Sequence, residues 1–221
     1  MKQYNSSSIS FPISWHIKRE PVYRLLDNVD YIENFFRDGE IMISCFNNFK
    51  KNPDEMQGDN QEGHAIVGEF GNSGFSNHII YESGKNAYVM STTKEITKKV
   101  IKDFNAVGAI KITNPAMFGH EIAKKLPFVN SGVEGSCDYE TSRVHFLEGE
   151  AGKILNKLDW NDPHSHQVFQ EITMGMELFL KLEKYKHQQE YRFAWFSKTD
   201  VENSIIVKCP EASLLCEKII F

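Results

Sequence analysis

The sequence predicts an α+β fold, because short strands and helices follow one another irregularly along one continuous chain. The chain has 221 residues, of which 41% are hydrophobic and 25% charged, so it can bury a substantial core and has an ordinary composition. Short apolar runs rich in Val, Ile, Tyr and Phe recur between Gly-containing turns, and only a few segments show helical spacing. This irregular order favours α+β over a doubly wound parallel sheet.

The chain shows no internal repeat and no interdomain linker, so we expect a single domain over residues 21–221. Residues 1–20 are rich in Ser and poorly patterned. This favours an N-terminal arm that lies on the domain.

The first predicted elements are a strand, a helix and a second strand. Residues 21–26 (PVYRLL) contain Val, Tyr and Leu, which fit a half-buried pleat. Asp27 or Asn28 can cap the following helix, and Gly39 suits its C-terminal stop. Residues 41–46 (IMISCF) predict the next strand.

The rest of the chain is expected to add seven strands and three helices. The strands are expected at residues 65–70, 78–82, 87–90, 109–112, 143–147, 191–196 and 205–207. Helices are expected at residues 94–104, at 114–126 behind Asn114-Pro115, and at 166–186, where apolar residues recur at amphipathic spacing. Residues 47–63 are rich in Asn, Asp, Glu and Gly, which predicts either a functional loop or a solvated surface excursion.

Several classes of protein lack support in the sequence. No apolar run could span a bilayer and residues 1–18 lack the core of a signal peptide, so we expect a cytoplasmic protein without membrane contact. The four cysteines form no C-x-x-C pair and are expected to be reduced, and no histidine or cysteine spacing suggests a metal site. Phosphate-loop, dinucleotide-fingerprint and serine-hydrolase motifs are missing.

The formal net charge of −5 gives no general basic footprint for nucleic acid. Two local lysine clusters depart from this balance, and each fits either a solvated helix face or a nucleic-acid contact. The clusters are Lys94, Lys98, Lys99 and Lys102, and Lys181, Lys184 and Lys186.

Three short motifs stand out by their order along the chain. Arg24 lies in the first predicted strand, Ser91 begins a Ser-Thr-Thr run after a strand, and Glu190 ends a Gln-Gln-Glu run that opens the strand at residues 191–196. This set resembles the Arg, Ser-Thr-Ser and Gln/Glu-x-Glu signature of one large class of ADP-ribosyltransferases. The stretches VYRLL, FFRDGEIMISCFNNFKKNPDEMQGDNQEG and YKHQQEYRFAW also resemble an uncharacterised group of bacterial defence-associated proteins, over most of residues 20–196.

The resemblance implies a split β-sandwich of two small sheets with flanking helices, with NAD in the cleft between the sheets. Glu190 would be the catalytic carboxylate that stabilises an oxocarbenium-like state as the nicotinamide–ribose bond breaks. Arg24 would hold a pyrophosphate oxygen, and Ser91 and Thr92 would hydrogen-bond the ribose and hold Glu190. Gln188 would lie on the same side of an extended chain as Glu190 and face the acceptor.

Two features complicate this assignment. Glu148-Gly149-Glu150 also fits the x-Glu pattern, but it precedes a turn into a helix, whereas Glu190 enters a strand as the family requires. The third serine of the family motif is Thr93 here, a change that keeps the hydroxyl group. Glu190 is therefore the preferred glutamate.

The resemblance also implies a biological setting, that of a toxin in a bacterial toxin–antitoxin or anti-phage system. NAD would be the co-substrate, and a cognate antitoxin protein would be a partner. The amide of Gln188 can pair with another amide or with a nucleobase edge. Together with the lysine clusters, this favours RNA or DNA over protein as the acceptor.

Three other functions remain open on the sequence alone. The chain could be an NAD glycohydrolase that uses water as acceptor, or a non-catalytic regulatory or binding module on the same fold. A Mg²⁺-dependent nuclease would use the acidic residues of the polar segment. Those residues are Asp54, Glu55, Asp59 and Glu62.

Overall fold

The largest sheet of the protein divides at one of its middle strands, and this fork organises the fold. The computed structural model describes residues 7–8, 20–51, 63–70, 76–147, 149–173 and 175–221. Nine strands form the main sheet, and all their pairings are antiparallel. Along the main path they are β1 (Ser7–Ser8), β8 (Val129–Ser136), β12 (Glu190–Ser197), β6 (Ala87–Thr93), β2 (Val22–Leu26), β7 (Gly108–Ile112) and β14 (Cys216–Ile220), with β3 (Glu40–Cys45) and β13 (Ile205–Lys208) branching from β6.

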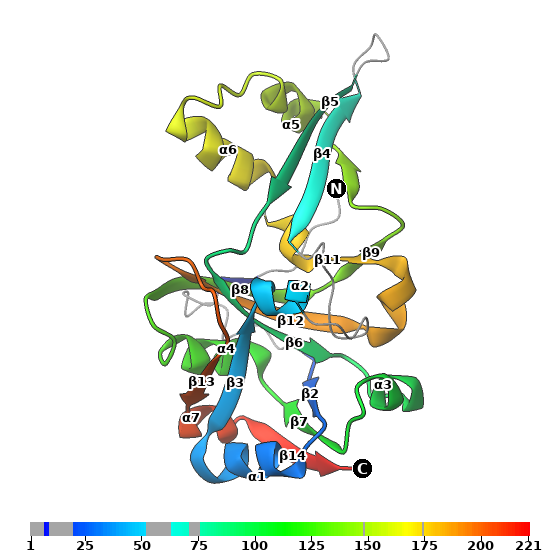
Figure 1. Ribbon diagram of the computed structural model, residues 1–221, viewed down its shortest axis with the longest axis vertical. Coiled ribbons are helices and arrows are strands. Elements are labelled where there is room, and N and C mark those ends of the chain that lie inside the picture. The colour runs from blue at the N-terminus through cyan, green and yellow to red at the C-terminus, as the bar shows by residue number, and fades with distance from the viewer. Residues whose placement is uncertain (1–6, 9–19, 52–62, 71–75, 148, 174) are drawn as a thin grey trace.

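The fork arises because two strands share one edge of β6. β12 pairs with the other edge of β6 over its whole length. On the shared edge, β3 pairs at Tyr88 and Val89, whereas β2 pairs only at Thr93. β3 and β2 therefore diverge from β6, as Figure 1 shows, and β3 continues into its pairing with β13.

Two smaller sheets lie beyond the main sheet. One contains β10 (Val144–Phe146), β4 (His64–Phe70) and β5 (Ser76–Glu82), and it lies with two helices at one end of the molecule (Figure 1). The other contains β11 (Leu180–Leu182) and β9 (Asp138–Glu140). The α+β class predicted from the sequence is confirmed.

Seven α-helices and two 3-10 helices are described in these parts of the chain. They are α1 (Val29–Asp38), α2 (Phe46–Lys51), α3 (Lys98–Asp103), α4 (Pro115–Ala123), α5 (Gly149–Leu155), α6 (Pro163–Thr173), α7 (Pro210–Ser213), η2 (Met176–Phe179) and η3 (Glu183–Gln188). No helix among the described residues is both long enough and apolar enough to cross a membrane.

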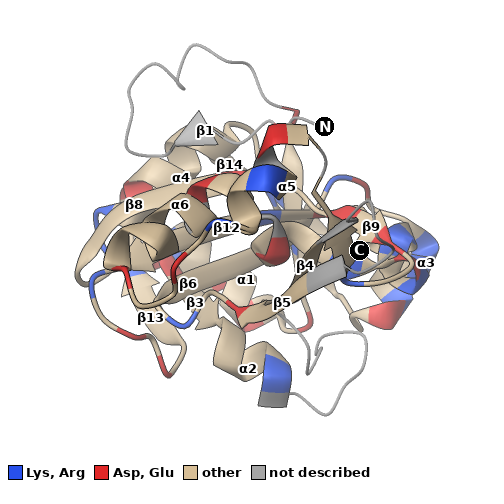
Figure 2. Cartoon of the chain, turned by 90° about the horizontal axis from the view of Figure 1, so that it is seen from above, with Lys and Arg blue, Asp and Glu red and all other residues tan. Residues whose placement is uncertain are grey.

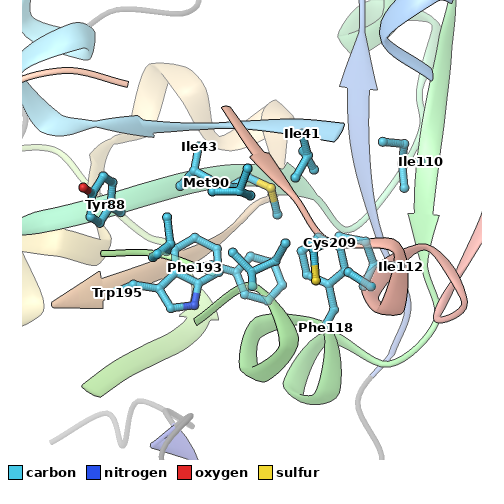
Figure 3. Packing of buried hydrophobic residues seen from close by; sticks show 14 of the residues in the cluster. Ile41, Ile43, Tyr88, Met90, Ile110, Ile112, Phe118, Phe193, Trp195 and Cys209 are labelled. Carbon is cyan, nitrogen blue, oxygen red and sulfur yellow. The ribbon is translucent and has the colours of Figure 1, made fainter. Parts of the chain in front are cut away.

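The main core lies on one face of β6 and β12. Because side chains alternate along a strand, Met90 and Phe193 point into this core while their neighbours point to the opposite face. Figure 3 shows Phe193 and Trp195 packed with Phe118 of α4, and the Trp195 indole N–H donates to the Gly119 carbonyl over 2.8 Å. The opposite face of β6 and β12 carries a smaller core cluster, which includes Val89 and Phe46, together with the site.

The local predictions succeed where the signals are contained in a few residues. α1 is capped by Asn28, whose side chain accepts from the Asp30 N–H over 2.8 Å, and it ends at Gly39 with φ of 71°. α4 begins behind Asn114, whose side chain accepts from the Met117 N–H. Both helices confirm their predicted start signals.

Other expectations were wrong. The helix expected at residues 166–186 ends at Thr173, and Gly175 adopts φ of 67° before η2, β11 and η3 follow. The helix expected at residues 94–104 begins only at Lys98, after an N-cap at Thr97. The strands β8, β9, β11 and β14 were not predicted, because polar or glycine residues interrupt their apolar pattern or because they are very short.

Gly39 gives a stability test of the α1 terminus. A Cβ at Gly39 would lie 2.2 Å from the Cys209 carbonyl carbon and from the Pro210 nitrogen, both rigid backbone atoms. We expect Gly39→Ala to lower the free energy of unfolding by at least about 3 kcal/mol, combining left-handed strain with this clash. Urea denaturation measures the change.

Gly149 provides the matched control. Its φ is 65°, and no described atom lies within 4 Å of the position that a Cβ would take there. Gly149→Ala should therefore lose only about 1 kcal/mol from left-handed strain. Equal losses for the two variants would contradict the packing of α1 against the segment that precedes α7.

Candidate functional site

A pocket of about 510 Å³ opens at the fork, where β3 and β2 leave β6. Side chains of β2, β3, β6, β11 and β12 line it, together with the residues at the ends of α3 and η3. We call it the fork pocket. Its cationic, amide, hydroxyl and carboxylate groups include Arg24, Ser91, Lys181, Gln188, Glu190 and Arg192.

Arg24 bridges the gap in the fork. Its Nη1 donates to the Ser91 carbonyl oxygen over 2.8 Å, at a point where neither β3 nor β2 is paired with β6. Its Nε is buried and has no hydrogen-bond partner among the described residues. Burial lowers the pKa of Arg24, and the negative charges of Glu190 and Asp27 partly oppose this shift.

Glu190 accepts hydrogen bonds from three side chains and is only 4% exposed. Its Oε1 accepts from Ser91 Oγ over 2.6 Å and from Arg192 Nε over 2.8 Å. Its Oε2 accepts from Lys181 Nζ over 2.7 Å. The Glu190 backbone N–H donates to the Tyr139 hydroxyl oxygen over 2.6 Å, which fixes the start of β12.

The charges around Glu190 keep it ionised. Burial by itself would raise its pKa, but the cations of Arg192 and Lys181 and the hydrogen bonds from Lys181 and Ser91 outweigh that effect. The pKa of Glu190 is therefore held well below its usual range. A carboxylate in this state can accept hydrogen bonds and stabilise positive charge at any physiological pH.

Gln188 reaches the pocket by a different route from the one expected. It ends η3, and Gln189 then adopts φ of 43°, so the chain between Gln188 and Glu190 is not extended. The left-handed residue turns both side chains to the same pocket. The Gln188 side chain is nearly buried, with the residue 3% exposed, and its Oε1 accepts from Lys181 Nζ over 3.4 Å.

Thr92, which was expected to contact the ribose, does not face the fork pocket. Thr92 follows Ser91 in β6, so its side chain points to the opposite face. It does not line the fork pocket, and its hydroxyl donates to the Tyr191 carbonyl over 2.7 Å. The Thr93 hydroxyl donates to the Gln188 carbonyl over 2.7 Å, so Thr93 contacts the backbone of a residue that lines the pocket.

The polar segment at residues 47–63 does not form one loop. Its first part belongs to α2, from which Asn48 and Phe49 line the fork pocket. Residues 52–62 lie outside the described residues, and with them the four acids of the nuclease alternative. The competing Glu150 lies on α5 with its side chain 81% exposed, paired with Lys153.

Sequence reasoning missed two cations that hold Glu190. Arg192 could have been found, since it lies two residues from Glu190 and so on the same face of a strand. Its side chain is 1% exposed, and its Nη1 also donates to the Leu178 carbonyl. Lys181 gave no usable signal, because the helix expected there would have placed it on a solvated face.

Metal-binding groups are not gathered in the part of the chain that the structure describes. No set of three or more His, Cys, Asp or Glu side chains there could hold a metal ion. The polar groups that line the fork pocket are cations, hydroxyl groups, amides and carboxylates, and of the carboxylates only Glu190 is buried.

The cation clamp on Glu190 can be tested without an activity. In Lys181→Met we expect the pKa of Glu190 to rise, because a neighbouring positive charge is lost. Carboxyl ¹³C NMR of glutamate-labelled protein measures it, with Glu190→Gln assigning the resonance. Since the lowered native pKa contributes stability that is lost as pH falls through it, acid unfolding of Lys181→Met should begin at higher pH.

Lys186→Met is the control, because Lys186 pairs with Glu183 at 3.9 Å on the exposed side of η3. It removes one lysine from the same segment and should leave the Glu190 titration unchanged. An unshifted Glu190 resonance in Lys181→Met would show that Lys181 does not govern this carboxylate.

Comparison with known proteins gives no relative for this chain. No protein-family model matches the sequence, no curated protein matches it, and no solved structure matches it. What can be said of its chemistry comes from the side chains of the fork pocket.

Proposed function

We propose that the protein is an NAD-dependent ADP-ribosyltransferase. The main support is the meeting of Arg24, Ser91 and Glu190 at the fork, with Ser91 Oγ 2.6 Å from Glu190 Oε1. These residues are separated by 67 and 99 positions, and each is the one that the sequence motif singles out. The forked sheet also supports a split β-sandwich, since β3 and β2 leave β6 on either side of the pocket.

The proposed reaction breaks the bond between the nicotinamide nitrogen and the ribose C1′ of NAD. The bonding electron pair leaves with nicotinamide, which becomes neutral, and positive charge develops on C1′ and the ring oxygen. An acceptor nucleophile then bonds to C1′ and releases its proton to solvent. The ionised carboxylate of Glu190 would stabilise the positive charge in a site largely closed to water.

Glu190 has capacity left for a sugar hydroxyl. Its Oε1 already accepts from Ser91 and Arg192, whereas its Oε2 accepts from Lys181 alone among the described contacts. A carboxylate oxygen can accept two hydrogen bonds, so Oε2 can take a second donor. A ribose hydroxyl would fit there, with Ser91 and Arg192 holding the carboxylate in place.

Arg24 suits the pyrophosphate. Its Nε–H is buried without a partner among the described residues, and an unpaired buried donor is unfavourable. A phosphate oxygen would satisfy it, because the guanidinium fork matches phosphate geometry. The residues present therefore fit NAD at both its ribose and its pyrophosphate.

A second function, NAD glycohydrolysis, is favoured by one observation. Gln188, the residue expected to face the acceptor, is 3% exposed and already accepts from Lys181. Water reaches such a position more easily than a large acceptor does. The two functions differ in the fate of the ADP-ribose, so labelled NAD distinguishes them: a transferase labels a macromolecule, and a glycohydrolase releases free ADP-ribose.

Glu190→Gln is the principal test. It preserves size but removes the negative charge, so nicotinamide release should fall by at least about 10²-fold. NAD binding, measured by calorimetry, should weaken far less, because the lost interaction strengthens mainly in the transition state. Glu150→Gln is the matched control and should release nicotinamide at the wild-type rate. Undiminished release from Glu190→Gln would refute the proposed role.

Gln188→Ala separates the acceptor from the NAD reaction. If Gln188 contacts the acceptor, this variant should lose macromolecular labelling while it keeps nicotinamide release. Both quantities can be followed in one reaction with labelled NAD and cell extract. Parallel loss of release and labelling would instead assign Gln188 to the NAD site itself.

A further inference from the structure

Six of the seven lysines in the two sequence clusters form one surface in the folded protein, whereas Lys181 is bound to Glu190 in the fork pocket. α3 and η3 pack against each other. Lys99 Nζ lies 2.9 Å from His187 Nε2, and the same His187 nitrogen lies 2.8 Å from Asp103. The Lys94 N–H donates to the Gln189 carbonyl over 3.0 Å. Segments almost ninety residues apart are thus held side by side.

This surface carries an excess of positive charge in an acidic chain. Residues 94–103 and 183–188 contain six lysines and three acids, whereas the whole chain has a net charge of −5. All six lysines are exposed, and Figure 2 shows the blue of Lys and Arg concentrated around α3. We call it the lysine surface: Lys94, Lys98, Lys99, Lys102, Lys184 and Lys186.

Half of the lysines on this surface form no ion pair with a described residue. Lys99 pairs with Asp103 at 2.7 Å and Lys186 with Glu183 at 3.9 Å. Lys94, Lys98 and Lys102 form no ion pair with any described residue. Three exposed ammonium groups without such a pair, on one short segment, suit a ligand with repeated negative charge.

The lysine surface adjoins the fork pocket at two points. Phe104, the C-cap of α3, lines the pocket, and so does Gln188, the last residue of η3. A ligand held by the lysines can therefore extend into the pocket past an aromatic ring and an amide. Nucleobases stack on aromatic rings and pair with amides, whereas phosphates bind lysines.

We infer that the lysine surface binds the phosphate backbone of single-stranded nucleic acid and presents a base to the fork pocket as the acceptor of ADP-ribose. This inference rests on the proposed function. A single strand suits this site better than a duplex, because Glu190 and Gln188 are 4% and 3% exposed and a base of a duplex would first have to be unpaired and flipped out of its stack.

The first experiment measures binding without NAD. A fluorescent 20-nucleotide RNA or DNA strand of mixed sequence is titrated with protein over a range of salt concentrations. The triple variant Lys94→Gln, Lys98→Gln, Lys102→Gln should bind more weakly. Its slope of log affinity against log salt should be shallower by roughly 2, since each lost phosphate contact removes about 0.7 for a single strand. RNA and DNA are run separately to identify the preferred strand.

The control triple variant changes three exposed lysines in other parts of the chain, Lys153, Lys157 and Lys198, to Gln. It has the same net charge as the first triple variant and should retain the wild-type salt slope. Equal slopes for the two triple variants, or no oligonucleotide binding by the wild type, would overturn the inference.

The second experiment adds labelled NAD. The Lys94, Lys98, Lys102 variant should label the oligonucleotide at least about tenfold less than the wild type, in line with lost phosphate contacts, while nicotinamide release in the absence of acceptor stays unchanged. If nicotinamide is released but only protein becomes labelled, the inference is overturned, whereas the proposed ADP-ribosyltransferase activity is supported. Lysine-dependent binding without any release would support the nucleic-acid surface and refute the proposed transferase.

Discussion

The buried carboxylate of Glu190 is the group on which the arrangement of the site depends. It joins three elements, because Ser91 of β6, Arg192 of β12 and Lys181 of β11 all donate to it. β11 belongs to a sheet separate from the main one, so the contact between Lys181 and Glu190 connects the two sheets. Removing one partner from a buried ion pair typically destabilises a protein by about 3–5 kcal/mol. The hydrogen bonds and ion pairs of Glu190 therefore help to hold β6, β12 and β11 together.

Stability alone does not explain such a network. Apolar side chains of similar volume often stabilise a core as well as a buried ion pair does. The other face of β6 and β12 follows that solution, with Met90, Phe193 and Trp195 in the main core. A carboxylate held ionised at a pocket wall, on the same two strands, is the pattern of a functional site. The divergence of β3 and β2 creates the pocket, and Arg192 and Lys181 keep Glu190 ionised within it.

Sequence reasoning recovered what local signals encode. Asn28 and Gly39 bound α1 through caps within a few residues, and the strand order of Arg24, Ser91 and Glu190 led to residues that meet in space. It failed where tertiary contacts determine the secondary structure. The amphipathic pattern after residue 166 is typical of one helix, but Gly175 breaks it, and Lys181 consequently lies in a strand.

β8 was missed for a related reason. Its sequence, VNSGVEGS, lacks the apolar run of a central strand, yet it pairs with β12 along most of that strand. Pairing with β12, whose side chains are bulky and buried, provides the packing that the small and polar residues of β8 do not provide themselves. Likewise, alternation along β6 could have excluded Thr92 from the pocket, had the Ser-Thr-Thr run been assigned to the strand and not to its end.

The most direct measurement is a structure of the protein with an NAD analogue whose nicotinamide–ribose nitrogen is replaced by carbon, so that it cannot react. We expect the analogue to occupy the fork pocket. Its nicotinamide-side ribose should hydrogen-bond Glu190, and its pyrophosphate should lie against Arg24. An analogue bound elsewhere, or a fork pocket that stays empty at saturating concentration of the analogue, would contradict the proposed NAD site.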